Sequence, residues 1–542
     1  MRSADVESYI ASLTPNAAFV EFFRRYGVRY RWFAMFTIVT GNIAAVLSGT
    51  IINVAIPDIM GAFGIGQDDA QWLSTANLAS STVSMLASAW MVQRAGLKGT
   101  VLVALALFIA GSLLGGLATN LEVMIASRIM QGVTAGLLTP LSMTIIFQVF
   151  PPGRQGLAMG ISAVGVILAP AIGPAVGGVL TDHFNWRYVF FLGLPVSMLT
   201  LLGTLVFMPG RQTARPGAFH WNGMILLCVS ITAVLVGLTR GERNGWDSDV
   251  ILGCFAVSLL SGIAFVHSQV GRPHPLLDLG LFANRNFLIM AINGCVFSAG
   301  LYASTYLLPL FLQLVQHMTP TDSGAMMIPA GLVMVAIFPF AGRLADRVDA
   351  RVLISTGILF FVVAFWLMRH ADADTGFWTL AWWIVLSRVG IGLVMPALQM
   401  GALSHVPPER LTQASGSFNF MRQMGGAFGV NLMSVTLERR NSVHAEYLAS
   451  TQTWGNSDTM DVLQTLRGLG QAIGHAGTDE WNAAIGFLQG MVQGQALQAA
   501  FSDSFVILAV AFLLTLAPTL ALRPRRRSPP ATTAPGGTAA AR

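Results

Sequence analysis

Charged side chains are scarce in this chain. Only 10% of its 542 residues are Asp, Glu, Lys or Arg, whereas 54% are hydrophobic. Soluble domains carry about 25% charged residues, so this composition excludes an ordinary soluble protein. Because lipid is the solvent that cannot hydrate charge, we expect a membrane protein whose apolar runs of about 20 residues cross the bilayer as helices.

Cysteine is nearly absent, and the usual marks of enzyme chemistry are missing. The three cysteines, Cys228, Cys254 and Cys295, all fall within apolar runs, and their odd number argues against a disulfide framework or a metal site. No Gly-rich phosphate loop precedes a Lys-Ser or Lys-Thr pair, which disfavours a nucleotide-driven process. No apolar run holds a cluster of histidine, acid and nucleophile, so the sequence predicts neither a cofactor nor a membrane enzyme.

Acidic side chains are missing from the interior of the apolar runs. All 25 Asp and Glu residues fall in connections or near the ends of the runs, and none of the nine histidines lies in mid-run. Three arginines do lie inside runs: Arg128, Arg388 and Arg422. A basic and polar interior offers no counter-charge to a strongly cationic ligand, so we expect anionic, zwitterionic or neutral amphiphiles as ligands.

Fourteen apolar runs are long enough to be membrane helices. Their approximate limits are residues 33–56, 70–92, 99–119, 122–149, 156–181, 187–208, 221–239, 249–268, 287–315, 323–342, 351–369, 377–400, 412–436 and 500–522. Most Lys and Arg residues of the connections fall on one side of this arrangement, and the positive-inside rule then places both termini in the cytoplasm. The net charge of +6 follows from this bias, and we do not read it as nucleic-acid binding.

Three pairs of similar stretches indicate an internal duplication, each pair at an offset of about 250–260 residues. The pairs are "QRAGLK" (93–98) with "ADRVDAR" (345–351), "SRIMQG" (127–132) with "SRVGIG" (387–392), and "PPGRQGLAMG" (151–160) with "PPERLTQASG" (407–416). Parallel six-helix halves are the design of facilitator-type transporters, whose central cavity opens to either side in turn. A duplicated bundle without a transport role is the alternative.

The predicted organisation follows from this duplication. Its segments are 1–32, cytoplasmic with an interfacial helix; 33–208, the N-terminal six-helix half; 209–286, two inserted helices; 287–522, the C-terminal six-helix half with a long outer connection at 437–499; and 523–542, a disordered basic cytoplasmic tail. In the first segment, "NAAFVEFFRRYGVRYRW" places aromatic residues beside arginines. This pattern predicts an amphipathic helix at the membrane interface, with a plain positive flank as the alternative.

Several stretches resemble the signatures of one family. They are "LSGTIINVAIP" (47–57), "QWLSTANL" (71–78), "SRIMQG" (127–132), "APAIGPAVGG" (169–178), "WRYVFFLGLP" (186–195), "RPHPLLDLGLF" (272–282), "GRLADR" (342–347) and "FNFMRQMGGAFG" (418–429). Together they resemble the major facilitator superfamily, and within it the fourteen-span drug/proton antiporters of the EmrB/QacA type. The resemblance implies an all-α major facilitator fold, with 14 transmembrane helices in two six-helix halves plus two inserted helices. It also implies efflux with the proton gradient as energy source.

The fifth span carries the antiporter signature. Its small and helix-breaking residues are Gly160, Gly173, Gly177 and Gly178, which we expect on one side of the helix, with Pro170 and Pro174 among them. Small residues let helices approach closely, and prolines remove backbone hydrogen bonds of the helix. The resemblance implies that this helix seals the cavity against proton leak, with tight packing as the alternative.

The connection after the second span resembles a family motif whose Asp pairs across helices and locks one transport state. Gln93 stands at that position, followed by Arg94, whereas the second copy has Asp346 and Arg347. The resemblance therefore implies an asymmetric lock carried by the C-terminal half. The alternative is that these charges only mark the inner membrane face.

Arg128 lies about 9 Å inside the outer end of its span, and Gln131 lies on the same helix face. A charge at mid-helix is costly, so it tends to face a cavity or a partner. The resemblance implies a role in proton coupling or substrate handling, and an arginine satisfied by backbone carbonyls is the alternative. The family normally has an Asp where this chain has Ser48, so the usual proton-carrying carboxylate is absent.

The remaining candidates are polar residues that could line the cavity or act in coupling. Those predicted for transport or coupling are Arg128, Gln131, Ser48, Asn53 and Arg422, and those predicted to line the cavity are Asn77, Tyr302, Tyr306, Gln313 and Asn419. Asn77 stands where the family more usually has an aromatic residue. The outer connection 437–499 reads as one or two helices that cap the cavity, meet a partner or serve as a passive linker.

These observations predict an exporter of small amphiphiles in the cytoplasmic (inner) membrane of a bacterium. Its expected partners are anionic or neutral amphiphiles, the lipid bilayer and, as the resemblance allows, a periplasmic adaptor protein with an outer-membrane channel. Because of Ser48, a proton-uncoupled facilitator or anion exchanger of the same fold is the main alternative. A transporter-like receptor is disfavoured by the intact antiporter motif.

Overall fold

Every regular element that the structure describes is a helix. The computed structural model describes residues 7, 9, 17–210, 217–272, 275–404, 406–453, 455–472 and 478–522. The α-helices are α2 Ala17–Tyr26, α3 Tyr30–Phe63, α4 Gln67–Gly116, α5 Leu121–Val149, α6 Gln155–His183, α7 Tyr188–Phe191, α8 Gly193–Phe207, α9 Trp221–Asn244, α10 Asp249–Gln269, α11 Leu279–Ala283, α12 Arg285–Leu314, α13 Pro320–Arg347, α14 Ala350–Met368, α15 Phe377–Leu403, α16 Leu411–Thr451, α17 Ser457–Ala472, α18 Thr478–Leu514 and α19 Leu516–Leu520.

The helices differ from the predicted spans mainly where the chain bends. The second and third predicted spans run on as α4, which is broken at Gly96, where φ is 73° and ψ is 174°. Only glycine adopts this backbone conformation without strain, so Gly96 marks the turn. The sixth span is divided into α7 and α8. Eleven helices of the described residues are long and apolar enough to cross a membrane, and the count of fourteen spans stays a prediction.

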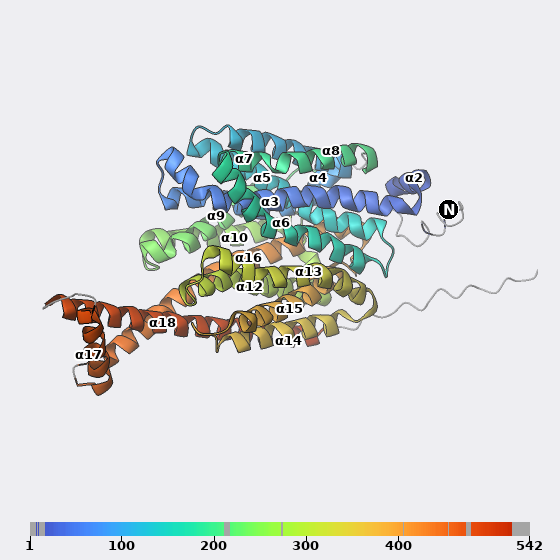
Figure 1. The fold of residues 1–542 in the computed structure, drawn as a ribbon. Coiled ribbons are helices and arrows are strands. Elements are labelled where there is room, and N and C mark those ends of the chain that lie inside the picture. The colour runs from blue at the N-terminus through green and yellow to red at the C-terminus, as the bar shows by residue number, and fades with distance from the viewer. Residues whose placement is uncertain are drawn as a thin grey trace, which may run out of the picture.

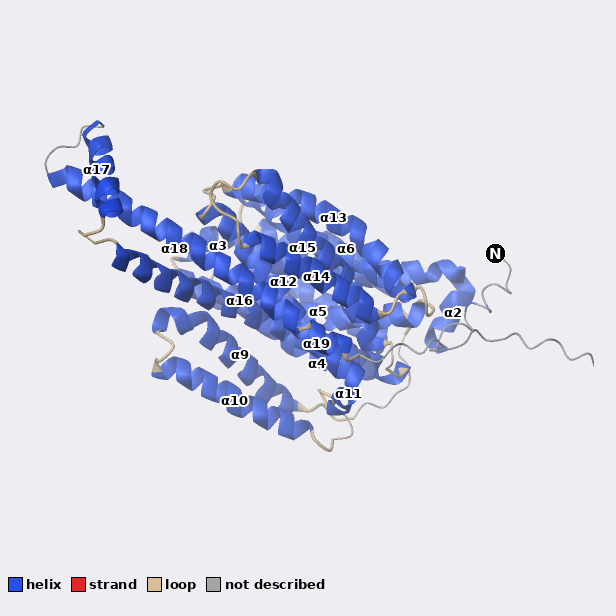
Figure 2. Cartoon of the chain, turned by 90° about the horizontal axis from the view of Figure 1, so that it is seen from below, coloured by secondary structure: helices blue, strands red, loops and turns tan. Residues whose placement is uncertain are grey.

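The helices form two groups that match the two halves of the duplication. In Figure 1, α3–α8 form one group and α12–α16 with α18 form the other. One continuous cluster of buried apolar side chains joins them, with members from α3, α5 and α6 on one side and α12–α16 on the other. Of the inserted pair, α9 packs on α10, α4 and α16, and Figure 2 shows α9 and α10 at the margin of the bundle.

The segment predicted as a long outer connection is built largely from continuations of membrane helices. Helix α16 runs on to Thr451, and α18 begins at Thr478, so both extend beyond the bundle, with α17 between them. Figure 1 shows α17 at one extreme end of the molecule and α2 at the other. We refer to these two ends as the α17 end and the α2 end.

The N-terminal helix α2 packs on the bundle with its aromatic face. Phe19 and Phe23 are 2% and 0% exposed, and both rings lie against Tyr30. The Tyr30 hydroxyl donates to Phe207 O at 2.7 Å, and the Tyr9 hydroxyl donates to Val149 O at 3.0 Å. Phe19 and Phe23, which the sequence pattern assigned to the membrane interface, are therefore covered by the protein itself.

Glycine allows the closest approach between helices of the C-terminal half. A Cβ atom at Gly425 of α16 would overlap the carbonyl oxygen of Cys295 in α12. We expect Gly425→Ala to lower the unfolding temperature, at a cost of about 1–3 kcal/mol, because the helices must separate. Thermal unfolding of the purified protein measures this.

The matched control for this substitution is Gly253→Ala in α10. No atom lies within 4 Å of a Cβ at Gly253, so this variant should be neutral or stabilising by up to about 1 kcal/mol. Equal unfolding temperatures for the two variants would contradict the close contact between α12 and α16.

Candidate functional site

The two halves meet at the α2 end through a carboxylate on a helix N-terminus. Asp346, near the end of α13, accepts hydrogen bonds from the backbone N–H groups of Gly156 and Leu157 at 2.8 and 3.0 Å. These groups belong to the first turn of α6, where unpaired N–H donors and the helix dipole favour a negative charge. The contact therefore links the C-terminal half to the N-terminal half.

The corresponding residues of the first half do not form such a contact. Gln93 and Arg94 are exposed, and so is Arg347 next to Asp346. Among the described residues, the carboxylate contact between the halves is thus made only by the second copy of the motif. The amide of Gln93 carries no charge to place on a helix N-terminus.

Glycines bring α6 and α13 together beside this contact. A Cβ at Gly342 would overlap the carbonyl oxygen of Gly156, and a Cβ at Gly160 would overlap that of Phe338. Nearer the α17 end of α13, Gly324 has no atom within 4 Å of a Cβ position. The glycine-mediated approach of α6 to α13 therefore lies at the α2 end.

The prediction that the antiporter glycines share one side of α6 is wrong. Gly160 faces α13, whereas Gly173 and Gly177 face Thr50 and Ile51 of α3. Thirteen residues of an α-helix turn through about 220° beyond full turns, so Gly160 and Gly173 point in nearly opposite directions. Gly178 is half-buried. The side chains of Pro170 and Pro174 lie outside the described residues, and α6 runs unbroken through both positions.

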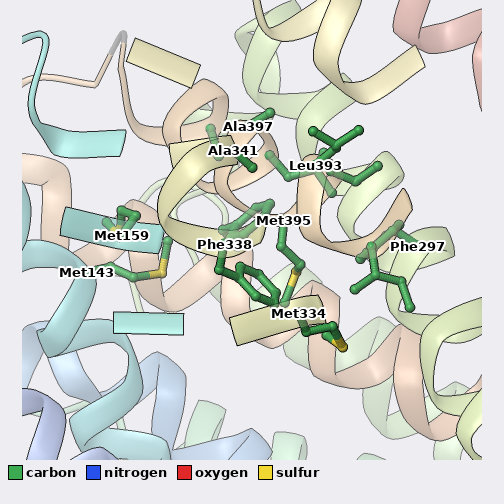
Figure 3. Close-up of a cluster of buried hydrophobic side chains, with 14 of the residues drawn as sticks. Met143, Met159, Phe297, Met334, Phe338, Ala341, Leu393, Met395 and Ala397 are labelled. Carbon is green, nitrogen blue, oxygen red and sulfur yellow. The ribbon is translucent and has the colours of Figure 1, made fainter. Parts of the chain in front are cut away.

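Methionine fills the space between the halves. Figure 3 shows Met143 and Met159 from the first half facing Met334, Phe338 and Met395 from the second. All five side chains are at most 8% exposed. Methionine is flexible and adapts to irregular gaps, so this contact can form without precise interlocking.

Arg128 is enclosed by neutral acceptors. Its side chain is 1% exposed, and its Nε donates to Leu73 O at 3.2 Å. Its Nη1 donates to Ser48 O at 3.0 Å and to Gln131 Oε1 at 2.6 Å, with Ser48 Oγ at 3.5 Å. Asn77 Nδ2 donates to the backbone carbonyl of Arg128 at 3.2 Å. The structure therefore brings together four predicted site residues from three helices, α3, α4 and α5.

The predicted coupling residue Asn53 lies in α3, and its side chain is outside the described residues. One member of the Arg128 network is absent from the prediction. Ser112 accepts a hydrogen bond from Gln131 Nε2 at 3.1 Å, and it is fully buried. A single serine in an apolar run carries no distinguishing signal, so only the folded arrangement reveals it.

Arg422 and Asn419 lie where α16 meets the N-terminal half. Arg422 is half-buried, its Nη2 donates to Asn419 Oδ1 at 3.2 Å, and its Nε is buried without a hydrogen-bond partner. Asn419 is 0% exposed, and its Nδ2 donates to Met143 Sδ at 2.8 Å and to Ser415 O at 2.9 Å. Asn419, predicted to line a cavity, is therefore instead a buried contact between the halves.

The other predicted cavity residues lie along α12. Tyr302 is 41% exposed, and its ring lies against Gly426 of α16. The Tyr306 hydroxyl lies 3.1 Å from Ser434 Oγ, and Gln313 is half-buried. In the described part of the chain, no hydrogen bond or ion pair connects these residues directly with the Arg128 network.

The arginines inside the spans have no acidic partner in the part of the chain that the structure describes. The ion pairs found there are Arg24–Glu7, Arg410–Asp278, Arg440–Asp503 and His444–Asp503. Arg128, Arg388 and Arg422 take part in none of them, and Arg388 is only 6% exposed. The described residues also contain no group of three or more His, Cys, Asp or Glu that could hold a metal ion. Within the described residues, these three arginines therefore have no acidic side chain to balance their charge.

Comparison with known proteins identifies the architecture. The family model of the Major Facilitator Superfamily matches residues 38–430. The chain is 29% identical over 476 residues to the multidrug export protein EmrB of Escherichia coli (strain K12), covering 87% of this chain and 91% of that protein. It is 30% identical over 403 residues to the fatty acid resistance protein FarB of Neisseria gonorrhoeae, covering 74% and 79%.

A third relative is the multidrug transporter protein MdtP of Bacillus subtilis (strain 168), 30% identical over 409 residues, which cover 74% of this chain and 75% of that protein. Among solved structures, the human organic anion transporter MFSD10 matches with a TM-score of 0.58 at 14% identity, covering 90% and 99% of the two chains. The proton:xylose symporter XylE matches with a TM-score of 0.56 at 12% identity, covering 92% and 97%.

The contact of Asp346 with α6 leads to a prediction about the α2 end. In Asp346→Asn the helix N-terminus loses its charged partner, at a cost of about 0.5–2 kcal/mol. We expect the two halves to separate at this end in a larger fraction of molecules. Distances between one spin label near Gly96, at the turn of α4, and a second near Arg347, at the C-terminal end of α13, measure this fraction, with Gln93→Asn as the neutral counterpart in the other half. An unchanged distance distribution in Asp346→Asn would contradict the prediction.

Proposed function

Because the chain belongs to the major facilitator superfamily, we propose that it exports small amphiphilic compounds by alternating access, in exchange for protons. The chain is a multi-pass membrane transporter and not an enzyme. Support for export comes from relatives whose names describe multidrug export and fatty acid resistance. Each of these relatives is matched over three quarters of its length or more.

The proposed cycle opens and closes the contact between the halves at the α2 end. The positive-inside rule assigns this end, together with both termini, to the cytoplasm. The bacterial relatives support a location in the cytoplasmic membrane of a bacterium. The contact of Asp346 with α6 and the methionine cluster then close the cytoplasmic side. The hydrogen bonds of Asp346 and the methionine contacts are lost when the halves separate, and the free energy of substrate binding can offset this loss.

A preference for anionic or neutral substrates rests on one observation, the three arginines inside the spans without acidic partners. Of these, Arg422 is the least buried, and its Nε has no hydrogen-bond acceptor. A substrate carboxylate could accept from this guanidinium, while an apolar tail rests on nearby methionine and aromatic side chains. A monovalent cation would instead be repelled.

The same fold can transport substrates with or without coupling to protons. Ser48 stands beside Arg128 where a titratable carboxylate would couple transport to protons. This arrangement favours, as the second candidate, a proton-uncoupled facilitator or anion exchanger.

The helical extension at the α17 end is the candidate contact for further proteins. Tyr447 of α16 is 67% exposed there, and Phe487 of α18 is 55% exposed. On the proposed topology this extension lies on the periplasmic side. We propose that a periplasmic adaptor protein, leading to an outer-membrane channel, binds it.

Coupling is tested in inverted membrane vesicles that hold a pre-formed pH gradient. If protons are exchanged, adding a substrate anion dissipates the gradient, and Arg128→Ala abolishes this response. Uptake of the labelled substrate with an undisturbed gradient would contradict proton exchange and favour the facilitator.

Substrate charge is tested with Arg422→Gln. We expect export of a medium-chain fatty acid to fall about tenfold, which corresponds to about 1.4 kcal/mol, because the carboxylate loses its cationic partner. Export of a neutral phenol of similar hydrophobicity should change little. Initial rates in vesicles, over a range of substrate concentrations, measure both.

The matched control for this variant is Arg422→Lys, which retains the positive charge and should keep part of the fatty acid transport. An equal fall for the acid and the phenol in Arg422→Gln would overturn the role in charge recognition. A preference for monovalent cations in the unmodified protein would overturn the proposed substrate class.

A further inference from the structure

Arg128 holds a buried guanidinium with an unused face. Nε and Nη1 donate to Leu73 O, Ser48 O and Gln131 Oε1, all of them neutral acceptors. Nη2 is buried and has no hydrogen-bond partner among the described residues. A guanidinium remains charged in proteins, and Nη2 carries two N–H donors. The site therefore presents a full positive charge and free donors on one side.

Ser48 adds a hydroxyl to the same place. Its Oγ lies 3.5 Å from Arg128 Nη1, near the limit of a hydrogen bond, and among the described residues this hydroxyl donates no hydrogen bond. The Ser48 side chain is 7% exposed and belongs to α3, whereas Arg128 belongs to α5. A hydroxyl of α3 thus lies beside the guanidinium of α5 that carries the unpartnered Nη2.

A buried cation is tolerated when a counter-charge accompanies it, because the interior does not screen it. No described ion pair supplies that charge to Arg128. The neutral acceptors of Leu73, Ser48 and Gln131 fill three donor positions and leave the net charge unchanged. Among the described residues, no ion pair of Arg128 brings a negative charge to Nη2.

We propose that Arg128 Nη2 and Ser48 Oγ bind a small monovalent anion, either a halide or the carboxylate of an organic acid. The anion accepts hydrogen bonds from both groups and neutralises the guanidinium. Arg422 is a weaker candidate for such a site because it is half-buried and closer to solvent. Arg388 is buried to a similar degree as Arg128, but no hydrogen-bond network is described around it.

The test uses the purified full-length protein in nanodiscs without substrate, so it does not depend on export. Its unfolding temperature is followed while chloride replaces a bulky sulfonate buffer anion at constant ionic strength, and in a second series while acetate replaces the same sulfonate. We expect a saturable rise, on the order of 1 °C at ten times the dissociation constant. A response to chloride assigns the site to halides, and a response to acetate alone assigns it to organic carboxylates.

Ser48→Asp provides the decisive variant because it places a carboxylate beside Arg128. The anion response should disappear or require about tenfold more anion. Ser48→Asn introduces a side chain of the same size as Asp but without its charge, and this variant should retain the anion response. Arg128→Gln removes the cation and should also abolish the response, as an independent check if it folds.

Two results would overturn the anion site. One is the absence of a saturable response to either anion in the unmodified protein. The other is an equal response in the unmodified protein and Ser48→Asp, which would place the bound ion elsewhere. Since no transport is measured, either result leaves the proposed export function standing.

Discussion

Burial of charge where water cannot reach is the constraint from which the organisation of this protein follows. A helix in lipid forms all its backbone hydrogen bonds within itself, but a guanidinium needs hydrogen-bond acceptors from neighbouring residues. Arg128 obtains them from three helices, and leaving a buried polar group unpaired costs about 1–3 kcal/mol. The position of α5 against α3 and α4 is therefore coupled to this one side chain.

The contact between the halves has a different physical basis. Gly156, Gly160 and Gly342 let α6 and α13 approach until backbone meets backbone, and Asp346 pairs with the N-terminus of α6. Both interactions are local to the α2 end. The methionines between the halves add contact that tolerates small displacements. A junction of this kind suits a transporter whose halves must separate repeatedly.

The duplicated sequence does not produce two equivalent halves. Asp346 holds a helix N-terminus of the other half, whereas its counterpart Gln93 is exposed. Arg128 sits in a network of hydrogen bonds, and none is described around Arg388 in the repeat. Equivalent positions of the two halves thus make different contacts, although the halves share one fold.

Most of the architecture was accessible from the sequence. The predicted family and all-helical fold class are confirmed, because scarce charge, long apolar runs and signature motifs are local properties of the chain. Within the candidate site, the spacing of three residues placed Arg128 and Gln131 on one helix face, and the structure adds the hydrogen bond between them. The roles assigned to these residues stay predictions.

Other features depended on the packing of helices that are distant in the chain. The burial of Asn419 against Met143, the inclusion of Ser112, and the two faces of the glycines in α6 all arise from such contacts. By itself the sequence determined that this is a helical membrane protein with charge at only a few interior positions, because the hydrophobicity and spacing of residues do not depend on the fold. Only the tertiary structure decided which groups surround Arg128, because its acceptors come from three helices that converge in the fold.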